Sequence, residues 1–176
     1  MKNKVLFIFL PILIITSIVV NSCKKDSQAQ IISTLFTNGT WQLASVLVFN
    51  YLGSSQLPTD TLNTTCDTTQ NFTFPTTSTC TYSNFACLSQ KTSAGTWSLT
   101  SDQLFLMSDM KCTDTVRVNG VLTIGTTMPF AYAKIVNLGQ YSLILQTGDI
   151  ATYFTPTTKR RIVQYGFVRV KLPTGN

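Results

Sequence analysis

From Gly39 to about residue 172, the chain is a succession of short segments in which apolar and polar residues alternate. Side chains alternate between the two faces of a β-strand, so this period of two predicts strands rather than helices. In the first segment, five apolar residues are spaced to share one face of a strand: Trp41, Leu43, Leu47, Phe49 and Tyr51. The segment therefore predicts a long strand with one buried face.

The later segments are just as short and are separated by turn residues. Asn119-Gly120 lies between two β-branched runs and is a strong signal for a tight hairpin. Other turn residues lie around Pro75, around Gly95 and at Asp102. The further strands are expected at 66–74, 78–84, 95–100, 103–108, 116–118, 121–123, 129–136, 141–147 and 161–172.

Eight to ten strands with short local links predict an all-β fold, an up-and-down antiparallel β-barrel. Closure of a barrel removes the exposed edges that a flat sheet would leave. Composition agrees, because all seven acids are Asp, the chain has no Glu, and Thr and aromatic residues are abundant. A β-sandwich is the alternative, but it would need longer crossover connections than this chain offers.

The amino-terminal residues predict export. Lys2 and Lys4 precede an apolar run from Val5 to Val20, which is typical of a signal peptide and short for a spanning helix. The run ends in Val20-Asn21-Ser22-Cys23, which resembles a lipobox. We therefore expect a lipoprotein signal peptide at 1–22, lipidation of Cys23, a lipidated tether at 23–33 and one barrel domain at 34–176.

Four cysteines follow Cys23, and an even number in an exported chain predicts disulfides. A zinc site is a poor alternative, since the chain has no Cys-x-x-Cys pair and no His; neither metal nor cofactor is predicted. With a turn centred on Thr76, Cys66 lies across from Cys87. Cys80 and Cys112 remain as a second pair, which would need the chain to fold back.

Several short motifs, in this order, resemble the lipocalin-like domain of Bacteroidota lipoproteins. They include Gly39-Thr40-Trp41-Gln42-Leu43, Gly95-Thr96-Trp97-Ser98-Leu99 and Gln103-Leu104-Phe105-Leu106. The resemblance covers roughly residues 34–172. It implies a small lipocalin-like barrel, anchored at the outer membrane on its periplasmic or surface face, with no assigned catalysis. The segment from Cys112 to Met128 is longer than in the family pattern.

The resemblance also implies an end-cap. In lipocalins, a tryptophan at the start of the first strand lies across one barrel end, and a basic residue late in the last strand covers it. Trp41 and Arg169 match these two positions, and Arg169 shares a predicted face with Tyr165 and Phe167. Arg161 is the alternative partner if the last strand has the opposite register.

The interior of such a barrel either holds a small ligand or is filled by side chains. The expected function is that of a membrane-anchored lipoprotein that binds a small lipophilic molecule. The alternative is a non-catalytic structural or interaction lipoprotein of the cell envelope with a filled barrel, whose partner would be an envelope protein. The aromatic residues expected to face a ligand are Phe49, Phe72, Phe74, Trp97, Tyr165 and Phe167.

The charged residues do not predict an enzyme. Acid–base chemistry would rest on Asp alone, and the densest acids, Asp102, Asp109 and Asp114, lie at predicted turns, where Asp usually caps backbone amides. Lys159-Arg160-Arg161 is the tightest basic cluster. It is a solvated hairpin or a patch that touches anionic lipid or glycan, and it is too small to predict a nucleic-acid partner.

Three threonines match the Asp-Thr-x signal for O-glycosylation in Bacteroidota. They are Thr61, Thr68 and Thr115, and Thr61 lies in the best candidate loop. The sequence does not predict an oligomeric state.

Overall fold

The computed structural model describes residues 30–62, 66, 68–75, 78–88, 92–118, 121–151 and 153–170. The chain divides into two units, Met1–Thr34 and Leu35–Asn176, and all the strands belong to the second. The predicted signal peptide, Cys23 and most of the tether lie outside the described residues. Within the described part, no helix combines the length and the apolar character needed to cross a membrane.

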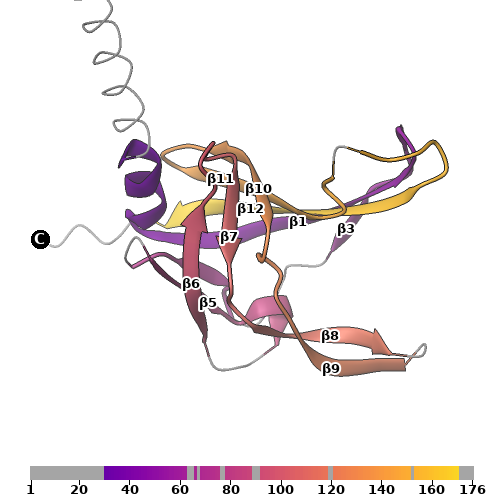
Figure 1. The fold of residues 1–176 in the computed structure, drawn as a ribbon. Helices are drawn as coiled ribbons and strands as arrows, with labels where there is room; N and C mark the ends of the chain where they lie inside the picture. Colours follow the sequence, from indigo (N-terminus) through magenta and orange to yellow (C-terminus); the bar gives the residue numbers. More distant parts are fainter. Residues whose placement is uncertain are drawn as a thin grey trace, which may run out of the picture. The chain divides into compact units, whose positions relative to one another are not determined.

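The second unit contains an eight-stranded antiparallel barrel with up-and-down order, which confirms the predicted fold class and rules out the sandwich (Figure 1). Each strand pairs with the next, and β12 pairs with β1 to close the barrel. This architecture is consistent with a lipocalin-like fold. The barrel strands are β1 (Thr40–Leu52), β4 (Asn71–Thr73), β5 (Thr79–Ser83), β6 (Ser93–Leu99), β7 (Phe105–Ser108), β10 (Ala133–Leu138), β11 (Ser142–Gly148) and β12 (Lys159–Val170).

The remaining elements decorate this barrel. Two short strands, β2 (Ser55–Gln56) and β3 (Asp60–Leu62), pair with β1. A short 3-10 helix, η1 (Phe85–Cys87), follows β5. β2 and β3 thus extend the sheet beside the second half of β1.

The segment between β7 and β10 forms a hairpin of its own. β8 (Cys112–Val118) pairs with β9 (Val121–Thr127) in a separate two-stranded sheet (Figure 1). Val118 lies across from Val121, so the strands flank the predicted two-residue turn, whose residues lie outside the described part. The hairpin prediction is therefore confirmed, and the hairpin is an insertion between β7 and β10.

A β-bulge in β1 overturns the predicted face of its second half. The register with β12 shifts between Leu43 and Ser45, which inserts one extra residue and reverses the later side chains. Gly166 lies across from Ser45, and a Cβ on Gly166 would come within 2.6 Å of the Ser45 hydroxyl oxygen. As a result Val46 is buried, and Phe49 turns to the other face. The prediction that Phe49 faces a lumenal ligand was wrong.

Candidate functional site

The predicted end-cap is present at one end of the barrel. Trp41 in β1 and Arg169 in β12 are direct cross-strand partners, and the Arg169 guanidinium carbon lies 4.4 Å from the centre of the Trp41 ring. The Trp41 side chain is fully buried, and its indole N–H donates to the Phe36 carbonyl at 3.2 Å. The alternative partner, Arg161, lies near the opposite end of β12.

Arg169 also reaches the chain that precedes the barrel. Its terminal nitrogen donates a hydrogen bond to the Leu35 carbonyl oxygen, while its Nε is buried without a hydrogen-bond partner. Burial lowers the pKa of Arg169 from its ordinary value. The Arg169 guanidinium therefore links the last strand of the domain to its first residues, because it contacts Trp41 in β1 and the Leu35 carbonyl before β1.

The predicted Cys66–Cys87 disulfide is present, with the two Cα atoms 5.3 Å apart. In the β4–β5 pairing, Phe72 lies across from Tyr82, which is one residue away from the register that would set Cys66 directly across from Cys87. Buried Gln70 packs beside the bridge, and its amide nitrogen lies 3.4 Å from the Cys66 sulfur. The disulfide thus holds η1 next to the segment that precedes β4.

Cys80 and Cys112 do not form the second disulfide that the sequence suggested. Both are buried free thiols. The Cys80 sulfur lies 3.3 Å from the Ser108 hydroxyl, and Cys112 interacts with Ser93. Burial raises the pKa of Cys80, and it raises the pKa of Cys112 to about 11. Each sulfur has a serine neighbour, and the two thiols lie near enough for Cys80 to contribute to the raised pKa of Cys112.

Aromatic rings occupy the barrel interior from the capped end toward the other. Phe36 contacts Phe74, with ring centres 5.0 Å apart, and Phe74 lies 4.3 Å from Phe72. Phe72 stacks on Phe130 at 4.8 Å, and Phe130 meets Tyr165 at 5.1 Å. This continuous row of rings makes the interior a packed core over the length that it spans.

Five of the six predicted lumen-facing aromatics belong to this core: Phe72, Phe74, Trp97, Tyr165 and Phe167. Four further rings, which were not predicted from the sequence, are buried in the same cluster: Phe36, Tyr82, Phe85 and Phe130. Phe130 lies in the turn before β10, and its carbonyl accepts a hydrogen bond from the Ser108 amide. Its position after Pro129 in a uniformly apolar run was the available signal.

A depression of about 190 Å³ lies beside the disulfide. Its wall is largely apolar and includes Leu43, Val46, Leu62, Phe85 and Tyr165. The Asp114 carboxyl also lines it, and burial raises the pKa of this group. Burial likewise raises the pKa of Tyr165 to about 12. The depression can accept a small apolar group, with Asp114 as its acid.

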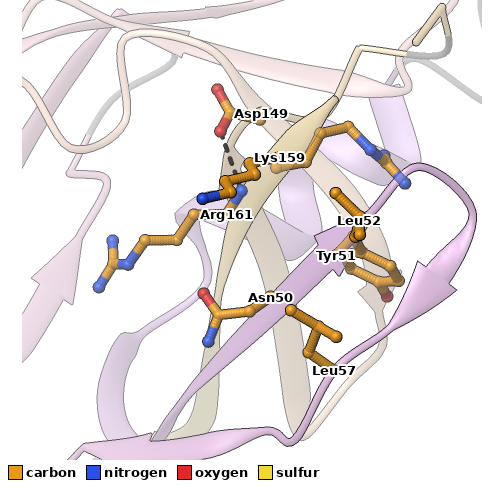
Figure 2. Close-up of a pocket in the computed structure, with 8 residues that line it drawn as sticks. Asn50, Tyr51, Leu52, Leu57, Asp149, Lys159 and Arg161 are labelled. Atoms are coloured by element: carbon orange, nitrogen blue, oxygen red, sulfur yellow. Dashed lines mark hydrogen bonds between the residues drawn. The ribbon is translucent and has the colours of Figure 1, made fainter. Parts of the chain in front are cut away.

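A larger groove of about 470 Å³ lies where β1, β2 and β12 run together (Figure 2). Asn50 is the cross-strand partner of Arg161, and Leu52 is that of Lys159. The Asp149 carboxylate accepts the Arg161 backbone N–H at 2.9 Å. The lining residues are Asn50, Tyr51, Leu52, Leu57, Asp149, Lys159, Arg160 and Arg161. Three cations and one acid thus share a groove with two leucines.

Each of the three densest acids accepts a backbone N–H, although Asp114 lies within β8 and not at the predicted turn. Asp102 accepts the Leu104 N–H at 3.1 Å, Asp109 accepts the Thr96 N–H at 2.6 Å, and Asp114 accepts the N–H of its own neighbour at 2.7 Å. Among the residues that the structure describes, no three His, Cys, Asp or Glu side chains gather in a group that could hold a metal ion.

The three candidate glycosylation threonines lie at the surface. Thr61 in β3, Thr68 before β4 and Thr115 in β8 are all exposed. Their hydroxyl groups are therefore accessible, which is a requirement for modification.

No model of a known protein family matches the chain, and no curated protein matches its sequence.

Proposed function

We propose that this chain is a lipid-anchored, non-catalytic lipoprotein of the cell envelope that acts through its outer surface. The observation that carries the proposal is the row of contacting rings from Phe36 to Tyr165, which makes the barrel interior a core. Binding then falls to the grooves outside the core and to envelope partners. The absence of His and Glu from the sequence, and the capping roles of the turn acids, support a non-catalytic protein.

The anchor rests on Cys23 and on the apolar run that precedes it. Cleavage before Cys23 and acylation would hold the barrel at the outer membrane, and more than one acyl chain makes such anchoring stable. The intact mass of the protein from its native membrane should show loss of residues 1–22 and addition of acyl chains. Cys23→Ala should leave uncleaved or soluble material. Recovery of the wild-type protein without lipid would contradict the anchor.

The outer-surface mode of binding is tested by native mass spectrometry of the same material. A filled interior predicts that no lipophilic molecule stays bound in a one-to-one complex until the protein is denatured. A stoichiometric lipophilic molecule released only on denaturation would contradict this mode and favour a carrier.

A second candidate function is the binding of a small lipophilic molecule at the depression beside the disulfide. Its apolar wall and its volume of about 190 Å³ favour this candidate, and such a ligand would be smaller than one that fills a barrel. Val46→Asp places a charge on that wall. The variant should lose a lipophilic ligand that sits there, while Val136→Asp, at an exposed site on β10, should keep it.

A further inference from the structure

The groove between β1, β2 and β12 combines a cationic surface with an apolar surface. On the polar side, Lys159 and Arg161 are exposed and belong to the same face of β12, because they are two residues apart. On the apolar side, Leu52 is 42% exposed and Leu57 is 45% exposed. Leu52 lies directly across from Lys159, so charge and apolar surface are adjacent.

The Arg160 side chain, which lines the groove, is held in place by several contacts. The Arg160 guanidinium carbon lies 3.6 Å from the centre of the Phe154 ring and 4.8 Å from that of Tyr51. Its terminal nitrogen donates to the Gly53 carbonyl at 3.0 Å. Gly53 has a φ of +58°, and a Cβ there would come within 2.5 Å of the Pro156 carbonyl oxygen. Arg160 therefore ties the loop to β12, and Lys159 and Arg161 are left to face a ligand.

The acids near the groove have donors of their own. Asp149 accepts the Arg161 backbone N–H, and Asp60 accepts the Asn50 side-chain N–H at 3.2 Å. Asp114 lies close enough for Arg161 to lower its pKa against the effect of burial. Of the residues that line the groove, three are cations and only Asp149 is an acid, so its lining has a net positive charge.

We propose that this groove binds amphiphilic anions, that is, a carboxylate or phosphate head with an alkyl portion. The head lies between Lys159 and Arg161, where charge-assisted hydrogen bonds are strongest, and the Asn50 amide adds a donor. The alkyl portion covers Leu52 and Leu57. A free fatty acid and an anionic phospholipid share this chemistry. The inference rests on the proposed function only in that it names a ligand for the outer surface.

The test uses the full chain in nanodiscs of zwitterionic phospholipid, with empty nanodiscs as a blank. Hexyl phosphate, hexanol and inorganic phosphate are titrated separately, and binding is followed by isothermal titration calorimetry. Hexanol lacks the charge, and inorganic phosphate lacks the chain. The proposal predicts that each binds at least about tenfold more weakly than hexyl phosphate, since it loses one of the two surfaces. Equal binding of inorganic phosphate and hexyl phosphate would overturn the apolar half of the proposal.

The charge variants replace each cation with a neutral polar side chain. Lys159→Gln with Arg161→Gln should weaken hexyl phosphate binding at least about tenfold, whereas Lys111→Gln with Lys134→Gln, at exposed sites outside the groove, should not. Leu57→Ser should weaken binding, and Leu104→Ser, at a leucine that is 54% exposed, should not. Circular dichroism checks the fold of each variant. Unchanged binding in the Lys159 and Arg161 variant would overturn the proposal.

Nanodiscs that contain some anionic phospholipid separate the two sources. If headgroups in the membrane occupy the groove, hexyl phosphate binds more weakly in these nanodiscs, and the loss disappears in the Lys159 and Arg161 variant. If the ligand is a free amphiphile, hexyl phosphate binds equally in both kinds of nanodisc. A ligand inside the barrel is distinguishable from both, because the groove variants would not change its binding.

Discussion

At the residue scale, Arg169 should be costly to remove. Arg169→Ala loses the contact with the Trp41 ring, worth about 0.5–2 kcal/mol, and the charged hydrogen bond to the Leu35 carbonyl. We expect the free energy of unfolding in urea to fall by about 2 kcal/mol. Lys159→Ala is the control, because Lys159 is exposed, and it should change stability by less than about 0.5 kcal/mol. Equal effects of the two variants would contradict the end-cap.

Asp109 makes a second residue-scale prediction, for the pH dependence of stability. The Thr96 N–H lowers the pKa of Asp109 by bonding to its charged form. A lowered folded pKa stabilises the protein above the ordinary aspartate pKa of about 4, and this stabilisation is lost as pH falls through the lower folded value. Asp109→Asn should therefore lose less stability than wild type on acidification. Parallel unfolding curves across that range would count against this bond.

Residue identities predicted some contacts well and others poorly. The contact between Trp41 and Arg169 was predicted from the resemblance to lipocalins, and the alternation that β12 keeps to its end placed Arg169 on the face that the contact requires. Phe49 was not predictable, because a single extra residue in β1 reverses every later side chain, and Ala44 gives no signal of a bulge. The basic cluster at 159–161 was visible in the sequence, but the groove was not, because its residues come from two strands, β1 and β12, and from two loops, at Leu57 and Asp149.

At the element scale, the Cys66–Cys87 bridge should hold η1, which follows β5, to the segment that precedes β4. It closes a loop with a sequence separation of 21, and loop-closure entropy then predicts about 3 kcal/mol of stabilisation. The double variant Cys66→Ser, Cys87→Ser should lose about that much in thermal or urea unfolding. A reducing agent should destabilise the wild type and leave the double variant unchanged. A double variant as stable as the wild type would show that the bridge adds nothing.

Strand existence was more predictable from the sequence than strand pairing. The Asn119-Gly120 signal located β8 and β9 because two-residue turns favour that dipeptide. The free thiols show the opposite case. An even cysteine count predicted a pair, but whether Cys80 meets Cys112 depends on how β8 leaves the barrel after β7, which no local pattern encodes. Non-local geometry of this kind limits the prediction of sites more than that of folds.

At the scale of the whole molecule, the account depends on the barrel interior being a core. An aromatic core has a large stabilising effect, since truncation of one buried phenylalanine costs about 3–5 kcal/mol. The contacting rings fill the interior along the row from Phe36 to Tyr165. The proposed function therefore falls to the surface of the protein, to the groove at β1 and β12, and to the membrane that Cys23 is proposed to engage.

The most direct test is crystallography under xenon pressure, because xenon enters apolar cavities that water avoids. The account predicts no xenon among Phe72, Tyr82 and Phe130 in the wild-type barrel, since their rings already contact one another. Phe130→Ala is the positive control, and it should admit xenon at the site of the missing ring. Xenon or lipid density inside the wild-type barrel, enclosed by these rings, would contradict the filled core. It would favour a protein that carries a small lipophilic molecule inside the barrel.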